Sequence, residues 1–332
     1  MTTTTAVTTR RITGLKPTGH LQLGNLVGAI QPMIRDQYAA DSVVFLADLH
    51  ALTVAHEPRR VRELTLEQAT TLLAAGLDAD RVLLYVQSQV PEHAELHYLL
   101  ECATGYGEAH RMIQFREKAG GAEHVRLSLL TYPVLMAADV LLHDAGEVPV
   151  GDDQRQHLEL ARDIATRFNG QYGNTFVVPV AVTPPVAARL MDLADPSAKM
   201  GKTSTSDAGT IFVLDSPDVV RRKVIRAVTD SAGGVDYDPV ARPGGSNLLE
   251  ILAACVGGSP AVLAGQFSGY GPLKQAVVEA VNAALRPIRM RHAELARDPG
   301  YVRRLLADGA ERASARTAET VSRAKRAIGL LS

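Results

Sequence analysis

Two polar loops in this sequence carry residue types that can bind phosphate. The first, residues 14–25, reads Gly-Leu-Lys-Pro-Thr-Gly-His-Leu-Gln-Leu-Gly-Asn. Its glycines let the backbone approach a ligand, and the helix expected after it offers free N–H groups to a phosphate. The second, residues 198–203, reads Ala-Lys-Met-Gly-Lys-Thr, and its two lysines can neutralise charge on a polyphosphate. Taken alone, the first remains open between a phosphate site and an ordinary turn, and the second favours a solvated linker.

Carboxylates and an amide gather at two further places. Residues 148–154 read Val-Pro-Val-Gly-Asp-Asp-Gln, at the end of a predicted strand. Asp152 or Asp153 can cap the helix that follows, whereas Gln154 has no such structural need. Asp139 lies in an otherwise apolar helix, where a carboxylate is costly to bury unless it reaches solvent or meets a specific donor. A ligand N–H would be such a donor.

His93 and His97 stand one helical turn apart, which is a spacing that zinc ligands use. Glu92 and Glu95 lie beside them, and a solvated helix face is therefore the better prediction. The adjacent side chains of Asp152 and Asp153 are expected to point apart at the start of a helix, so they are poorly placed to bind one metal ion together. We expect no metal ion to be held by the protein's own residues.

The apolar pattern predicts the elements that position these residues. Apolar runs of strand length occur at 11–15, 42–47, 81–86, 148–150 and 175–180, and they alternate with helical patterns at 24–38, 58–76 and 153–168. Residues 92–143 are helical in pattern. This alternation predicts an α/β fold, in which a parallel sheet is covered by helices and binds its ligands at the carboxyl ends of the strands.

The chain divides by pattern into four segments. Residues 1–9 lack periodicity and are predicted to be a disordered tail, residues 10–185 form the sheet domain, and residues 186–215 form a linker that carries the second loop. Residues 216–332 are predicted to form a helical domain, with helices at 217–228, 247–255, 273–286, 287–296 and from 301 to the end.

The overall charge conceals a basic end. The chain of 332 residues has 35 Lys and Arg against 36 Asp and Glu, whereas residues 286–332 alone carry a net charge of +6. Four arginines recur there on one face of a predicted helix: Arg312, Arg316, Arg323 and Arg326. Such a face either contacts nucleic-acid phosphates or is a solvated surface.

Cysteine content and hydropathy exclude several classes of protein. The two cysteines, Cys102 and Cys255, form no Cys-x-x-Cys pair, which excludes a disulfide framework, a thiolate zinc site and a four-cysteine cluster. No stretch reaches the ~20 apolar residues of a membrane-spanning helix. We therefore predict a cytoplasmic protein that does not enter a membrane.

Together, these motifs resemble the class I aminoacyl-tRNA synthetases, and closely the bacterial tryptophanyl-tRNA synthetases. Residues 17–25 are similar to the His-Ile-Gly-His signature, residues 199–203 to the Lys-Met-Ser-Lys-Ser loop, and residues 148–154 to the amino-acid-side motif of that family. Further matches at 48–53, 114–118, 130–139 and 243–249 extend the resemblance over almost the whole chain. Each motif is weak alone, but their order and spacing are highly specific.

The resemblance implies a Rossmann-type catalytic domain, a C-terminal α-helical domain that binds tRNA, and a homodimer. It implies that L-tryptophan reacts with ATP and Mg²⁺ to give tryptophanyl-adenylate, and that the amino acid then passes to tRNA(Trp). The residues carried over as catalytic, through stabilisation of pyrophosphate, are Lys118, Lys199 and Lys202. The four arginines on the predicted helix face, Arg312, Arg316, Arg323 and Arg326, would contact tRNA.

Two larger sets of residues follow from the same resemblance. Those implied to bind ATP are Lys16, Pro17, Thr18, Gln22, Gly24, Asn25, Gly151, Asp152, Asp153, Gln154, Lys199, Met200, Gly201, Lys202 and Thr203. Those implied to bind tryptophan are His50, Tyr132, Met136, Asp139, Val148, Val150 and Gln154, with Asp139 accepting the indole N–H.

The signature motifs depart from the family pattern at a few positions. Gln22 replaces the first histidine of the signature, Gly201 and Thr203 replace both serines of the lysine loop, and Lys16 stands where many bacterial members have Gln. These changes affect the expected rate and inhibitor profile rather than the reaction. They leave open whether the chain is a housekeeping enzyme or a second, inhibitor-resistant copy.

Three other functions compete with this interpretation. Tyrosyl-tRNA synthetases typically have Gln where Met136 stands and Ser-Asp-Gln where residues 152–154 read Asp-Asp-Gln, which favours indole over phenol here. A non-catalytic paralogue that binds tRNA or senses tryptophan would not need both loop lysines. A small-molecule adenylyltransferase would not need the basic end.

Overall fold

The structure is a computed structural model that describes residues 9–112, 125–151, 154–182, 190–201 and 207–331. Its five strands form one parallel sheet in the order β3-β2-β1-β4-β5. They are β1 (Arg10–Leu15), β2 (Asp41–Leu46), β3 (Leu83–Val86), β4 (Glu147–Pro149) and β5 (Val180–Val182). The predicted α/β class is therefore confirmed. No helix within the described ranges is long and apolar enough to cross a membrane.

The strand order reverses beside β1, which places a ligand site at one edge of the sheet. The chain continues from β1 to β2 and β3 on one side, and later adds β4 and β5 on the other side. Ligands of open α/β sheets bind beyond the carboxyl ends of the strands at such a reversal. The segments that follow β1 and β4 contain Lys16 and Gly151, so these residues lie at the same edge.

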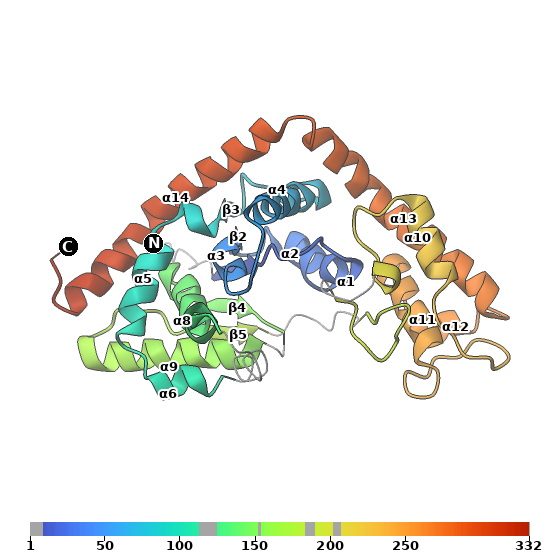
Figure 1. The fold of residues 1–332 in the computed structure, drawn as a ribbon, viewed down its shortest axis with the longest axis horizontal. Coiled ribbons are helices and arrows are strands. Elements are labelled where there is room, and N and C mark those ends of the chain that lie inside the picture. Colours follow the sequence, from blue (N-terminus) through green and yellow to red (C-terminus); the bar gives the residue numbers. More distant parts are fainter. Residues whose placement is uncertain (1–8, 113–124, 152–153, 183–189, 202–206, 332) are drawn as a thin grey trace, which may run out of the picture.

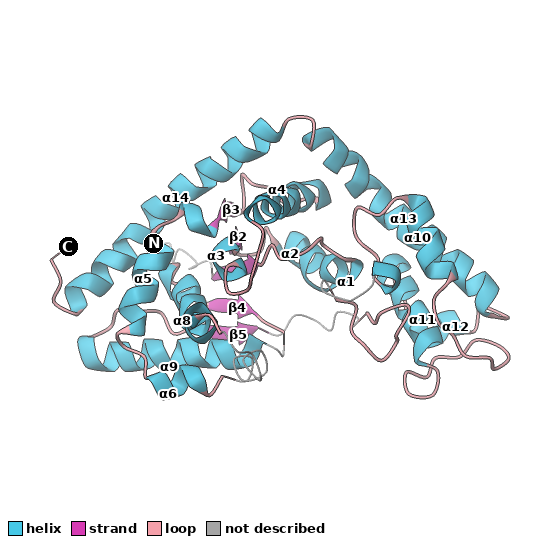
Figure 2. Cartoon of the chain, viewed as in Figure 1, coloured by secondary structure: helices cyan, strands magenta, loops and turns pink. Residues whose placement is uncertain are grey.

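Helices cover both faces of the sheet (Figure 1; Figure 2). Strand residues alternate between two apolar cores: Val44 and Leu46 belong to the first, Val43 and Phe45 to the second. The first core is covered by α1 (Leu23–Asn25), the π-helical turn η1 (Leu26–Ile30), α2 (Gln31–Asp36) and α4 (Pro58–Ala75). The second is covered mainly by α5 (Glu92–Glu101), α8 (Leu127–Leu142) and α9 (Arg155–Tyr172).

Short elements complete the sheet domain and lead into a helical segment. They are α3 (Asp48–Ala51), η2 (Gln87–Gln89), α6 (Tyr106–His110) and η4 (Asp207–Gly209). The helices after them are α10 (Pro217–Ile225), α11 (Pro243–Val256), α12 (Pro260–Ala264), α13 (Tyr270–Leu295) and α14 (Pro299–Ala327). In Figure 1, α13 and α14 form the two arms of an arch over the sheet domain.

Two of the predicted elements differ from the structure. The strand predicted at 175–180 begins only at Val180, because the Asn169 side chain accepts hydrogen bonds from the backbone N–H groups of Thr175 and Phe176 and replaces a strand ladder. The two helices predicted at 273–286 and 287–296 are a single helix, α13, with Pro287 inside it. Buried residues on both sides of Pro287 keep this helix packed against the first core.

The last helix packs against the sheet domain. Buried residues of α14 lie in the second core, and α14 packs against β3 and α5. A Cβ atom added at Gly309 would lie 1.9 Å from the carbonyl oxygen of Leu84, so the helix backbone approaches the strand closely. Helix α13 likewise packs against α4, and buried residues of α10, α11 and α13 share the first core with the sheet. The predicted boundary at residue 216 stays a prediction.

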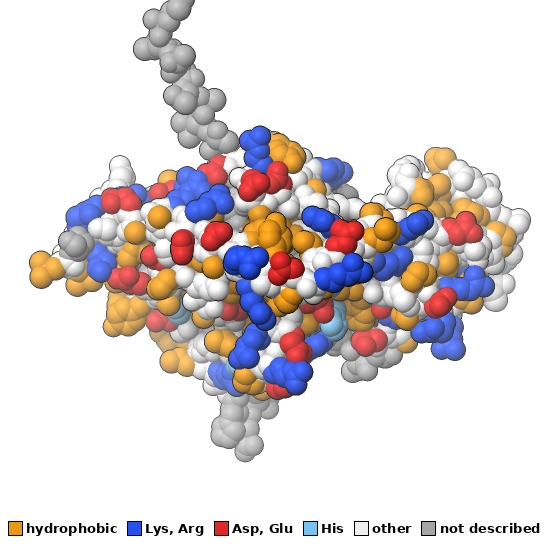
Figure 3. Space-filling model, turned by 90° about the horizontal axis from the view of Figure 1, so that it is seen from above, with side chains coloured by type: hydrophobic (Ala, Val, Ile, Leu, Met, Phe, Trp, Pro, Cys, Tyr) orange, Lys and Arg blue, Asp and Glu red, His pale blue; other side chains and the backbone are white. Residues whose placement is uncertain are grey.

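The four arginines of α14 were expected to share one exposed helix face, but two of them pair with acidic residues of the sheet domain. Arg316 pairs with Asp41 of β2, and Arg323 pairs with Asp144 at 2.7 Å, so both hold the helix against the sheet domain. Arg312 and Arg326 are exposed, and Arg326 pairs with Glu319 of its own helix at 2.8 Å. Seen from above the arch, Lys and Arg side chains alternate with Asp and Glu instead of forming a continuous basic stripe (Figure 3). The tRNA contact of these arginines remains a prediction.

Candidate active site

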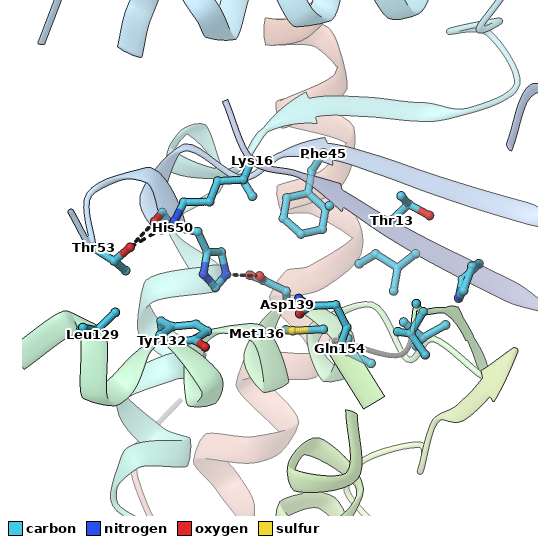
Figure 4. A pocket seen from close by; sticks show the side chains of 18 residues that line it. Thr13, Lys16, Phe45, His50, Thr53, Leu129, Tyr132, Met136, Asp139 and Gln154 are labelled. Carbon is cyan, nitrogen blue, oxygen red and sulfur yellow. Dashed lines mark hydrogen bonds and ion pairs between the residues drawn. The ribbon is translucent and has the colours of Figure 1, made fainter. Parts of the chain in front are cut away.

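A cavity of about 470 Å³ opens where the strand order reverses. Residues of β1, β2 and β4 and of the segments that follow them form one side, and α8 forms the opposite side (Figure 4). Its wall is mostly apolar with a few polar groups, as is typical of small-molecule sites. The cavity therefore lies where ligands of this class of sheet bind.

All seven residues implied to bind tryptophan line this cavity: His50, Tyr132, Met136, Asp139, Val148, Val150 and Gln154. Tyr132, Met136 and Asp139 recur at steps of four and three, which places them on one face of α8. That face turns toward β1 and β2 (Figure 4). Lys16 and Gly151, from the set implied to bind ATP, line the same cavity.

Asp139 is the buried charge of the cavity, with only 2% of its surface exposed. Its Oδ2 lies 2.9 Å from His50 Nε2, and its Oδ1 lies 2.7 Å from both His93 Nδ1 and Gln87 Nε2. Burial alone would raise the pKa of this carboxyl, but the hydrogen bonds from His50 and His93 outweigh burial and lower the pKa to about 2. Asp139 is thus an ionised acceptor at neutral pH.

The prediction that His93 lies on a solvated helix face is wrong. His93 has no exposed surface, because α5 packs against α8 and turns this side chain toward Asp139. His97 is half-buried and pairs with Glu101 at 3.0 Å. Neighbouring glutamates in the sequence indicate an exposed helix face, but they do not reveal a carboxylate supplied by another helix.

Several residues of the cavity wall were given no role of their own from the sequence, although Gly14 and Thr53 lie in the motifs at 14–25 and 48–53. Phe45 and Gly14 lie at the carboxyl ends of β2 and β1, and Thr53 follows α3. A Cβ atom at Gly14 would lie 2.6 Å from Phe45 Cζ, so only glycine leaves room for the ring. Their position at strand ends was the available signal. The remaining wall residues that were not singled out are Ile12, Thr13, Ala47, Leu129, Val140 and Pro149.

Hydrogen bonds made by the side chains of Gln22 and Gln68 hold the first polar loop, residues 14–25, in place. Gln22 is buried, and its Oε1 accepts from the backbone N–H of Gly24 at the start of α1. Gln68 of α4 donates to the carbonyl of Gly19 at 2.9 Å. Lys16 extends along the cavity and donates to Thr53 Oγ1 at 3.1 Å (Figure 4). Pro17, Thr18 and Asn25 belong to the same loop, but do not line the cavity.

The second polar loop contacts the first directly. Gln22 Nε2 donates to the carbonyl of Met200 at 3.0 Å, and Leu23 N–H donates to the carbonyl of Ile211 at 2.8 Å. Met200 is buried, whereas Lys199 is exposed and Gly201 is half-buried. Gln22, the residue that departs from the family signature, thus ties the two motifs together.

Five residues singled out from the sequence lie outside the described residues: Lys118, Asp152, Asp153, Lys202 and Thr203. Their roles remain predictions. Among the residues that are described, no group of three His, Cys, Asp or Glu side chains is arranged to hold a metal ion.

The chain matches the family described as class I tRNA synthetases (W and Y) over residues 5–286. It belongs to this family. The match spans the sheet, both polar loops and the helices up to α13.

Full-length relatives narrow the comparison to the tryptophan branch. The chain is 57% identical to Tryptophan--tRNA ligase 1 of Streptomyces coelicolor, over 97% of this chain and 98% of that protein. Its structure is similar to the crystal structure of tryptophanyl-tRNA synthetase from Mycoplasma pneumoniae, with a TM-score of 0.88, 34% identity and 98% of each chain covered. It is also similar to the Campylobacter jejuni enzyme complexed with ADP and tryptophan, with a TM-score of 0.84, 32% identity, and 97% and 100% coverage.

Proposed function

We propose that this protein activates L-tryptophan with ATP and transfers it to tRNA(Trp). The observation that carries the proposal is the cavity, which places an ionised acceptor, Asp139, inside an otherwise apolar wall of a size suited to an amino-acid side chain. The full-length identity to tryptophan--tRNA ligases supports the same activity. The helical segment and the basic end provide the surface that a tRNA requires.

In the proposed complex, the indole occupies the apolar part of the cavity. Phe45, Met136 and Val150 contact its rings, and Asp139 accepts its N–H. A site that hydrogen-bonds its substrate rejects analogues without the donor by about 10⁴ to 10⁵, because the buried acceptor is left unpaired. Phenylalanine is excluded in this way.

The polar end of the amino acid then faces the loop after β1. Its carboxylate attacks the α-phosphate of ATP, the bond to the β-phosphate breaks, and pyrophosphate leaves. Lys118, Lys199 and Lys202 stabilise the charge that develops on pyrophosphate, and Gly24 and Asn25 at the start of α1 bind the nucleotide. Mg²⁺ bound with ATP would supply positive charge that offsets the charge on the phosphates.

A homodimer is part of the proposal. Tyr98, Tyr106 and Leu127 are 66%, 71% and 74% exposed. They belong to α5, α6 and α8, and α8 packs against both of the other helices. Large exposed apolar side chains on neighbouring helices can form a surface that another chain covers. The second copy would cover this surface. We also propose that the enzyme works in the cytoplasm, where its tRNA substrate is used.

Amino-acid-dependent ATP–pyrophosphate exchange tests the proposal. Purified protein with ATP and Mg²⁺ should exchange pyrophosphate when tryptophan is added, and not when tyrosine replaces it, because an apolar Met136 gives the phenol hydroxyl no partner. Equal exchange with tyrosine would favour the tyrosyl alternative. Absence of exchange with both would favour a non-catalytic paralogue.

A further inference from the structure

A chain of buried polar side chains runs from Asp139 into the second core. Asp139 Oδ1 accepts from His93 Nδ1 at 2.7 Å, and His93 Nε2 lies 2.8 Å from the hydroxyl of Tyr85. The same hydroxyl lies 2.7 Å from His143 Nε2. Tyr85, His93 and His143 have no exposed surface, and of these four residues only Asp139 lines the cavity. The chain therefore joins β3, α5 and α8 behind the site.

The two oxygens of Asp139 have different numbers of hydrogen-bond partners: Oδ1 has two and Oδ2 has one. Gln87 Nε2 and His93 Nδ1 both donate to Oδ1, whereas His50 Nε2 bonds to Oδ2. Each carboxylate oxygen has two acceptor sites. Oδ1 is thus filled by groups outside the cavity wall, while Oδ2, on the side of the wall residue His50, retains a site for a ligand N–H.

Burial determines where most protons of the chain lie. Burial raises the pKa of Tyr85 well above its usual value and lowers the pKa of His143 well below its usual value, so Tyr85 keeps its proton and His143 is neutral. The Tyr85 hydroxyl can donate to only one of its two imidazole neighbours, and the other must donate to it. In the tautomer with the His93 proton on Nδ1, this nitrogen donates to Asp139, and Nε2 accepts from Tyr85. Tyr85 then accepts from His143, whose Nδ1 is buried without a partner and serves as the bare nitrogen.

The far end of the chain is held by charged groups. Arg10 donates to the backbone carbonyl of His143 and pairs with Asp41 at 2.8 Å. Asp41 also pairs with Arg316 of α14. The last helix of the protein therefore helps to hold the residues that lie behind the cavity.

We propose that His93, supported by Tyr85 and His143, is a positioning residue that directs Oδ2 of Asp139 toward the N–H of the substrate and so determines amino-acid specificity. The proposal rests on tryptophan activation in this cavity. A hydrogen bond weakens steeply when its donor and acceptor are misaligned. Without His93, the carboxylate loses the bond that fixes its rotation from behind, and His50 and Gln87 alone remain.

Two substitutions of His93 should each retain one of the two hydrogen bonds that its imidazole ring makes. In His93→Asn, the amide nitrogen can replace Nδ1 and retain the bond to Asp139. In His93→Gln, the longer amide can replace Nε2 and retain the contact with Tyr85, but it loses Asp139. The readout is the ratio of kcat/KM in pyrophosphate exchange for tryptophan over its benzothienyl analogue, which has sulfur in place of the indole N–H.

We expect His93→Gln to lower this ratio by about tenfold or more, through a higher KM for tryptophan, because a hydrogen bond to a charged group is lost. His93→Asn should retain most of the ratio, and the KM for ATP should stay unchanged in both variants. Tyr85→Phe removes the hydroxyl and keeps the ring. If thermal melting shows that His93→Gln does not fold, Tyr85→Phe provides the test of the proposal. We expect it to lower the ratio about threefold, since it acts one bond further away.

His97→Gln is the matched control, because His97 lies one turn further along α5 and pairs with Glu101 instead of Asp139. The ratio should be unchanged in this variant. An unchanged ratio in His93→Gln and in Tyr85→Phe would overturn the proposal, even if both substrates reacted more slowly, because a purely structural role affects them alike. Wild-type protein without tryptophan-dependent exchange would instead contradict the proposed function, so the two failures are distinguishable.

Discussion

The amino-acid half and the phosphate half of the candidate active site are built in different ways. In the amino-acid half, Asp139 is held by side chains from α3, α5 and the segment after β3, all of which pack into the protein. In the phosphate half, Lys16 and Lys199 lie outside the helices and strands, and Lys199 is exposed. Buried polar partners fix the direction of a specificity group, whereas loop residues can approach a charge that develops during reaction. Substitutions in the two halves should therefore separate the KM for tryptophan from kcat.

The largest effect should follow from Asp139→Ala. Wild-type protein should prefer tryptophan over phenylalanine by about 10⁴ to 10⁵ in kcat/KM, and the variant should lose most of this preference, because the acceptor that rejects phenylalanine is gone. Pyrophosphate exchange measured with both amino acids checks this expectation. An unchanged KM for tryptophan in the variant would show that Asp139 does not contact the substrate.

The lowered pKa of Asp139 predicts how stability and tryptophan binding of the wild type depend on pH. Because the pKa of Asp139 is lowered to about 2, its carboxylate stabilises the fold above its unfolded pKa of about 3.9 and loses this contribution as the pH falls toward 2. Asp139 is ionised throughout the neutral range. The wild-type KM for tryptophan should therefore show no titration of this group near neutral pH.

The next largest effect should follow from Lys202→Ala, in the phosphate half. This substitution should lower the rate of adenylation by about 10² to 10³ with little change in tryptophan affinity, because the charge that Lys202 stabilises develops mainly in the transition state. Single-turnover adenylation and equilibrium binding of tryptophan measure the two quantities separately. Lys274→Ala is the control, since Lys274 is a lysine of α13 that donates to the carbonyl of Ala227 at 2.8 Å. If Lys202→Ala formed the adenylate at the wild-type rate, the second polar loop would be only a linker without a role in adenylation.

The sequence predicted the parallel sheet for physical reasons, and the residues implied to bind tryptophan line one cavity, although their role stays a prediction. Strands buried on both faces are continuous apolar runs, and α4 begins at Pro58 and ends before Gly76, which has a φ of 112°. Asp139 was singled out as a carboxylate in an apolar helix, whereas Tyr132 and Met136 came from the family resemblance.

The parts that were missed depend on contacts between distant segments. The burial of His93 requires the packing of α5 against α8, and the docking of α14 on β3 requires a close approach at Gly309. An amphipathic pattern shows that a helix has an apolar face, but not which surface covers it. The strand predicted at 175–180 failed because Asn169 occupies the backbone N–H groups that a ladder would use.

The smallest effects should come from the arginines of α14, which the structure divides into two pairs. Arg312→Gln with Arg326→Gln removes the exposed pair, and it should raise the KM for tRNA a few-fold and flatten its salt dependence, because phosphate contacts release counterions. Arg316→Gln with Arg323→Gln removes the pair that holds α14 on the sheet domain, and it should lower the free energy of unfolding by about 1 kcal/mol per arginine. Aminoacylation at several salt concentrations, together with denaturant unfolding, distinguishes the two outcomes.

Tryptophan-dependent pyrophosphate exchange should survive in the exposed-pair variant, since its residues lie at the cavity and the two loops. If the exposed-pair variant charged tRNA as well as the wild type at every salt concentration, this face would be only a solvated surface. The tRNA contact would then lie elsewhere on the protein.

A crystal structure of the protein with L-tryptophan tests the central claim most directly. The account predicts the indole inside the cavity of about 470 Å³, with its nitrogen within hydrogen-bond distance of Asp139 Oδ2 and with His93 still bonded to Oδ1. An indole bound outside this cavity, or inside it with the nitrogen turned away from Asp139, would contradict the account.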